Sequence, residues 1–96
     1  MNLTPPHHIL TYIKDRKDQR VGCFLALKDD EGLVGIGWSL CNHKDRFDRD
    51  RALDIAEGRA YAAIRRPSPI PHSMRPHLDD FVSRARKYFK TEDVRF

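Results

Sequence analysis

Two nearly continuous apolar segments, residues 21–28 and 33–41, are the most regular pattern in the chain. They flank Asp29-Asp30-Glu31-Gly32, in which Gly32 can supply the positive φ of a type I turn with a following bulge. The pattern predicts a β-hairpin. Both strands are apolar on both faces, which is typical of strands covered on two sides. A two-stranded ribbon is marginal alone, so we expect helices to cover it, a third strand to extend it, or another subunit to pair with it.

Residues 8–13 fit two elements. Thr4-Pro5-Pro6 is a helix-entry signature, because a threonine can cap the first turn and proline is tolerated there. A short helix with an apolar stripe is therefore the favoured interpretation. The alternation of Ile9, Thr11 and Ile13 with Leu10 and Tyr12 also fits a strand, which remains the competing interpretation.

The second half of the chain has helical spacing. On a helical wheel, residues 48–65 form a helix with one broad apolar face. This face is made of Ala52, Leu53, Ile55, Ala56, Ala60, Ala63 and Ile64. The proline-rich connector 65–71 ends that helix. A second helix is expected from near Ser73, with an apolar stripe made of Leu78, Phe81, Val82, Ala85 and Phe89.

These elements predict a single domain over residues 1–96. The fold class is α+β, a small antiparallel β-hairpin or sheet packed with two C-terminal α-helices, preceded by a short N-terminal helix or strand. A chain of 96 residues is near the lower limit for a self-sufficient core, so a homo-oligomer is expected.

Composition narrows the class of partner. The chain is 33% charged and 40% apolar, which disfavours both a disordered chain and a membrane span. The net charge of +4 favours anionic partners such as nucleotides, nucleic acid or an acidic protein. The cations that end the second helix are explained by its dipole, so nucleic acid is the less favoured of these partners. No signal peptide is visible at the start, and we expect a cytoplasmic protein.

The two cysteines, Cys23 and Cys41, are not expected to form a disulfide. If Lys28 pairs with Leu33 in the hairpin, Cys23 lies opposite Trp38 and out of reach of Cys41. Both then act as small buried apolar groups in a reducing compartment.

The row Gly35, Gly37, Ser39 leaves one face of the second strand without bulk. Glycine in a strand commonly marks the close approach of another backbone or of a ligand. Because the following helix is rich in alanine, we favour helix packing over ligand approach.

The loop before that helix carries the densest group of binding side chains. An amide offers a hydrogen-bond donor and an acceptor, cations offer positive charge, and a ring offers a stacking surface. The amide is Asn42, the cations are Lys44 and Arg46, and the ring is Phe47. Either Asp45 or Asp48 can cap the helix that follows.

Arg59 lies toward the edge of the apolar face of the first helix. A guanidinium there snorkels outward, pairs internally or reaches a buried anion. Internal pairing and snorkelling are the favoured structural explanations. Arg59 is nevertheless the best single candidate for anion binding, because arginine suits bidentate recognition of phosphate.

Motifs for catalysis or metal binding are missing from the sequence. It contains no P-loop, no G-x-G-x-x-G, no H-E-x-x-H and no C-x-x-C. The five histidines are not spaced as a metal site or a triad. We therefore expect no metal, no cofactor and no enzymatic activity.

The stretch IGWSLCNHKDRFDRDRALDIAEGRA, residues 36–60, resembles the pattern I-G-x-x-x-x-x-P-x-D-x-F-x-x-x-x-G-x-x-I-A-x-x-R-A of the first type of anti-Thoeris sponge. Those phage proteins sequester cyclic ADP-ribose isomers without cleaving them. The resemblance covers roughly residues 34–62, about a third of the chain. It departs at His43, where the pattern has proline, and at Ala52, where it has glycine.

The resemblance implies a non-enzymatic phage anti-defence protein in the cytoplasm of a bacterial host. Its ligand would be a cyclic nucleotide second messenger, a cyclic ADP-ribose isomer or a cyclic oligonucleotide, bound between subunits of a homo-oligomer. Arginine or lysine would bind the pyrophosphate, while carboxylates and an amide would bind ribose and a ring would bind adenine. The expected ligand-binding residues are Trp38, Asn42, Lys44, Asp45, Phe47, Asp48 and Arg59. The alternatives are a small basic inhibitor of a host protein and a nucleic-acid-binding module.

Overall fold

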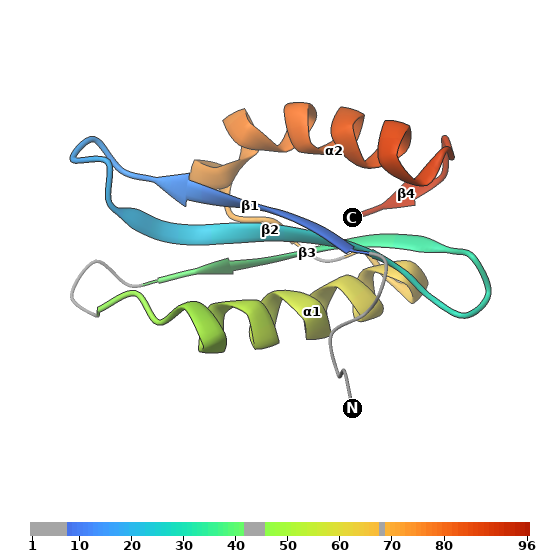
Figure 1. The fold of residues 1–96 in the computed structure, drawn as a ribbon, viewed down its shortest axis with the longest axis horizontal. Helices are drawn as coiled ribbons and strands as arrows, with labels where there is room; N and C mark the ends of the chain where they lie inside the picture. The colour runs from blue at the N-terminus through green and yellow to red at the C-terminus, as the bar shows by residue number, and fades with distance from the viewer. Residues whose placement is uncertain (1–7, 42–45, 68) are drawn as a thin grey trace.

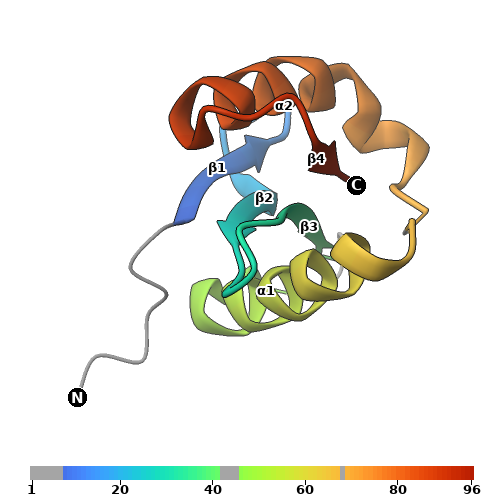
Figure 2. The same ribbon diagram turned by 90° about the vertical axis from the view of Figure 1, so that its right-hand side faces the viewer.

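The computed structural model describes residues 8–41, 46–67 and 69–96. A four-stranded sheet in the order β1-β2-β3-β4 forms the middle layer, with α1 on one face and α2 on the other (Figures 1 and 2). The elements are β1 (His8–Lys14), β2 (Arg20–Lys28), β3 (Val34–Leu40), α1 (Arg49–Arg65), a 3-10 turn (His72–Met74), α2 (Arg75–Phe89) and β4 (Val94–Arg95). The expected α+β class and the two C-terminal helices are confirmed.

The favoured helix over residues 8–13 is wrong, because this segment is the edge strand β1. It pairs antiparallel with β2, with Leu10 opposite Leu25. Its alternation then buries Ile9 and Ile13 toward α2, while Tyr12 packs on the α1 side. The apolar β2 backbone needs a partner on each side, and this requirement outweighs the local helix-entry signal.

The predicted hairpin is confirmed, but its register is shifted by one residue. Gly32 has a φ of +83°, and the Asp29 N–H donates to the Leu33 carbonyl at 2.9 Å. The Asp29 carboxylate also accepts from the backbone N–H of Leu33 at 2.8 Å. This closes a tighter loop than expected, so the register places Lys28 opposite Val34 and Cys23 opposite Ser39. The two cysteines form no disulfide, and Cys23 is buried as predicted. Cys41 is only half-buried, so its predicted burial is wrong, because it follows the last residue of β3 at the open end of the sheet.

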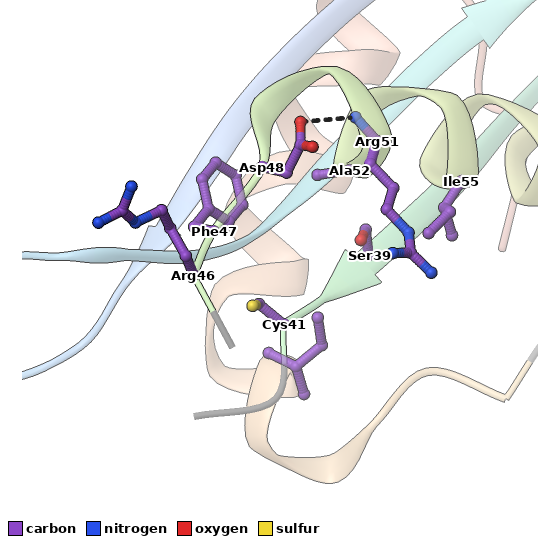
Figure 3. Close-up of a pocket in the computed structure, with 9 residues that line it drawn as sticks. Ser39, Cys41, Arg46, Phe47, Asp48, Arg51, Ala52 and Ile55 are labelled. Carbon is purple, nitrogen blue, oxygen red and sulfur yellow. Dashed lines mark hydrogen bonds between the residues drawn. The ribbon is translucent and has the colours of Figure 1, made fainter. Parts of the chain in front are cut away.

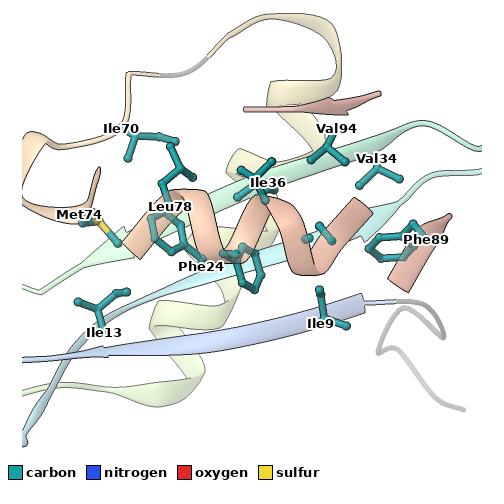
Figure 4. Packing of buried hydrophobic residues seen from close by; sticks show 14 residues of the cluster. Ile9, Ile13, Phe24, Val34, Ile36, Ile70, Met74, Leu78, Phe89 and Val94 are labelled. Carbon is teal, nitrogen blue, oxygen red and sulfur yellow. The ribbon is translucent and has the colours of Figure 1, made fainter. Parts of the chain in front are cut away.

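The α2 face of the sheet is filled by large side chains (Figure 4). Phe24 is fully buried and stacks on Phe81 of α2, with ring centroids 5.7 Å apart. All five positions of the predicted α2 stripe are buried. The remaining members of this cluster are Ile9, Ile13, Ala26, Val34, Ile36, Ile70, Met74 and Val94.

The α1 face is built from small residues. A Cβ added at Gly37 would overlap the backbone of Ala56 and Ala60, and one added at Gly35 would overlap the carbonyl of Ala60. The row of small residues on β3 is therefore occupied by α1, which confirms helix packing as its explanation. Burial of Cys23, Leu25 and Leu27 on β2 completes this second core.

Arginines reach around both edges of the sheet. Arg84 of α2 donates to the carbonyl of Leu10 on β1 at 3.2 Å, and Arg59 of α1 donates to the carbonyl of Trp38 on β3 at 3.0 Å. At the other end of β3, two residues pair in parallel with β4, and Arg95 of β4 donates to the carbonyl of Ile64. In the described ranges, no helix is long and apolar enough to cross a membrane.

Candidate functional site

An open groove lies where β3 ends and α1 begins (Figure 3). Its volume is about 470 Å³, which falls within the usual size of a small-molecule site. Leu40 and Ile55 leave 39% and 36% of their surfaces exposed, so the wall includes apolar surface. The lining residues are Ser39, Leu40, Cys41, Arg46, Phe47, Asp48, Arg51, Ala52 and Ile55.

The groove is positioned by the start of α1. The Asp48 carboxylate accepts from the backbone N–H of Arg51 at 3.2 Å, which is an N-cap and fixes where the helix begins. The predicted capping role of Asp48 is thus confirmed. Ala52, in the first turn, is buried against the sheet. Arg51 and Ile55, one turn apart on α1, both line the groove.

The groove is electropositive. Arg46 and Arg51 are exposed, and among the described residues neither has a carboxylate within ion-pair distance. Figure 3 shows Arg51 extending along the groove past Ser39, whereas Arg46 projects outward on the other side of Phe47. The positive end of the α1 dipole adds to their field. The cations beside the ring and the apolar wall therefore have no carboxylate partner within the described part of the chain.

A second cluster lies on the far side of Phe47, around Tyr12. Arg49 Nε donates to the Tyr12 hydroxyl at 2.9 Å, and this hydrogen bond is the main cause that raises the pKa of Arg49. The Arg20 guanidinium carbon lies 4.3 Å from the Tyr12 ring centroid. Phe47 meets the same ring edge-on, with centroids 6.1 Å apart. The cluster thus joins β1, β2 and α1.

Trp38 and Arg59 form a separate pair at the edge of β3. The Arg59 guanidinium carbon lies 3.7 Å from the centroid of the Trp38 ring, in addition to its hydrogen bond to the Trp38 carbonyl. Trp38 packs on the α2 side and Phe47 on the α1 side. The structure therefore does not place these two predicted aromatic residues in one site, and it gives Arg59 an internal partner.

The other predicted ligand-binding residues divide in two. Phe47 and Asp48 both line the groove. Asn42, Lys44 and Asp45 lie outside the described residues. Arg51, Arg49 and Tyr12 were not predicted as site residues from the sequence. The spacing of Arg51 and Ile55 after Asp48 could have indicated that Arg51 lines the groove. The position of Tyr12 follows only once residues 8–14 are known to be a strand of the sheet.

The described residues offer little for metal binding or nucleophilic chemistry. No group of three or more histidine, cysteine, aspartate or glutamate side chains that could hold a metal occurs in ranges 8–41, 46–67 and 69–96. Burial raises the pKa of the Cys23 thiol to about 11, and its Sγ lies 3.8 Å from the Ala52 carbonyl. This cysteine is therefore structural.

Comparisons of the chain with protein-family models, curated proteins and solved structures found no match. We therefore infer its function from the charged and aromatic side chains that line the groove.

Proposed function

We propose that this protein binds a cyclic nucleotide second messenger in the groove beside α1 and sequesters it without cleaving it. The observation that carries the proposal is the placement of Arg46 and Arg51 around Phe47, because the structure pairs neither cation with a carboxylate among the described residues. Guanidinium groups beside an aromatic ring match a ligand that has phosphate and a base.

Each part of such a ligand has a counterpart in the groove. A pyrophosphate would lie near Arg51, at the positive end of α1. The base would contact the ring of Phe47 and the apolar surface of Leu40 and Ile55. The second carboxylate oxygen of Asp48 could accept from a ribose hydroxyl while the first caps the helix.

The biological role follows from the resemblance stated above. A phage anti-defence protein in the host cytoplasm would need affinity for the messenger and no turnover. The proposal includes a homo-oligomer, because the resemblance implies that the ligand is bound between subunits. Cyclic ADP-ribose isomers and cyclic oligonucleotides are the ligands to test first.

Calorimetric titration of the purified protein with these nucleotides is the test. We expect saturable heat with at least one of them, and chromatography with mass spectrometry should recover that nucleotide intact. Arg51→Ala should weaken binding about tenfold or more, as loss of a charged hydrogen bond to phosphate predicts. The matched control is Arg86→Ala, an exposed position on α2, which should bind as the wild type does. Absence of heat with every nucleotide would refute the proposal.

A further inference from the structure

The end of the molecule that holds the groove also gathers cations from other elements. β1 runs antiparallel to β2, and β2 to β3, so the β1–β2 turn lies at the same end as the start of α1 (Figure 1). Positive side chains converge there from both. They are Lys14, Arg16, Lys17 and Arg20 near the turn, and Arg46, Arg49 and Arg51 near the helix.

Most carboxylates of this end already have internal partners. The Asp15 carboxylate accepts from the backbone N–H groups of Lys17 and Gln19, at 2.9 and 3.0 Å. Asp18 lies 3.5 Å from the Lys14 ammonium, and Asp48 caps α1. Asp50, in the first turn of α1, also lies near Arg49. The surface keeps an excess of positive charge after these pairings.

Tyr12 orients two of the cations. Arg20 lies over its ring and Arg49 donates to its hydroxyl, so two guanidinium groups from different elements are fixed beside one side chain. Neither has a carboxylate within ion-pair distance in the described part of the chain. Preorganised arginines lose less entropy when they bind phosphate.

A second hollow lies between Arg49, one member of this pair, and the groove. It has a volume of about 560 Å³ and is lined by Arg46, Phe47, Asp48, Arg49 and Asp50. It shares Arg46, Phe47 and Asp48 with the groove. Phe47 therefore lies between two hollows, and arginine side chains lie on both sides of its ring. An aromatic ring with arginine side chains on both sides is an arrangement with which proteins hold unpaired bases and the backbone that joins them.

We infer that this end of the molecule binds single-stranded nucleic acid, with phosphates on the Tyr12-oriented pair Arg20 and Arg49 and a base on Phe47. This surface shares Arg46 and Phe47 with the proposed messenger site, but Arg20 and Arg49 belong to this surface alone and Arg51 belongs to the messenger site. A strand of a few nucleotides passes over Phe47 from one hollow to the other.

Fluorescence anisotropy with labelled 12-nucleotide DNA and RNA strands tests the inference. Affinity should fall with salt, with a slope of log K against log salt of about −2 for three phosphate contacts, by Arg20, Arg49 and Arg46. The double variant Arg20→Ala/Arg49→Ala should bind about tenfold or more weakly and flatten the slope by about 1.4, which is two contacts at roughly 0.7 each. The charge-matched control is Arg86→Ala/Lys87→Ala, which removes two exposed cations from α2.

Four results would overturn the inference: no binding to either strand, equal losses in the two double variants, duplex binding as tight as single-strand binding, or inorganic phosphate competing at the same concentration as the strand. Circular dichroism checks that each variant is folded. Because Arg20→Ala/Arg49→Ala leaves Arg51 in place, its calorimetric titration with cyclic nucleotides should be unchanged. Failure of this surface is thereby distinguished from failure of the messenger site.

Discussion

The two faces of the sheet are packed by opposite means. On the α2 face, rings and branched side chains such as Phe24, Phe81 and Ile36 fill the space between layers. On the α1 face, Gly35 and Gly37 let the helix backbone at Ala56 and Ala60 approach the strand directly. Large side chains that fill the interlayer space stabilise the α2 face. Close contact between the backbones of α1 and β3 stabilises the α1 face.

This difference explains why the groove lies beside α1. A helix seated on glycines has little freedom to shift, because a small displacement brings backbone into contact with backbone. The start of α1 is fixed in the same way by the Asp48 cap. Arg51 and Ile55 are therefore held at a defined distance from the end of β3, whereas α2 lies on side chains that can repack.

The largest expected effect comes from adding one methyl group to the α1 face. Gly37→Ala places a Cβ where the backbone of Ala56 lies, so α1 must move, and we expect the free energy of unfolding to fall by about 3 kcal/mol or more. Urea denaturation followed by circular dichroism measures it.

The control for that substitution is Gly58→Ala. Nothing lies within 4 Å of a Cβ added at Gly58, so this change should stabilise the protein by about 0.5–1 kcal/mol through helix propensity. Equal stability of the two variants would show that α1 is not held by backbone contact.

A smaller effect is expected from changing volume on the α2 face. Phe24→Leu removes part of a buried ring that stacks on Phe81, but the neighbouring side chains can partly fill the space. We expect a loss of about 1.5 kcal/mol in the same assay. A loss larger than that of Gly37→Ala would reverse the comparison between the two faces.

The smallest effect concerns the helix start. Asp48→Ala removes the acceptor of the Arg51 N–H and should cost about 1 kcal/mol, which is the usual value of an N-cap. Asp48→Asn keeps an acceptor and is the conservative control, expected to lose less than half as much. If both variants lose the same amount, the contribution of Asp48 is not capping.

Local signals in the sequence were enough for the hairpin and the helices. Asp29 to Gly32 encode their turn, and the α2 stripe encodes its buried side. Strand β1 was only the competing interpretation, because residues 8–13 satisfy helix and strand patterns alike. The need of β2 for a partner on its second edge decides between them. The one-residue register error arose from side-chain bonds of Asp29, which apolar alternation does not encode.

Only the site residues that belong to one continuous loop could be predicted from the sequence. Phe47 and Asp48 belong to the loop whose composition indicated binding. Arg51 lies on the helix, and Tyr12 with Arg20 comes from strands that meet the loop only in the folded chain. The partner of Arg59 also depends on which strand edge α1 covers.

We propose that the ligand lies in the groove at Arg51 and not at the Arg59–Trp38 pair. Calorimetric titration of Arg51→Ala and Arg59→Ala with cyclic ADP-ribose isomers and cyclic oligonucleotides tests it most directly, since each variant removes one guanidinium from α1. We predict that Arg51→Ala weakens binding about tenfold or more, whereas Arg59→Ala lowers stability by about 1 kcal/mol and leaves affinity within about twofold. Loss of binding in folded Arg59→Ala with wild-type affinity in Arg51→Ala would contradict the account.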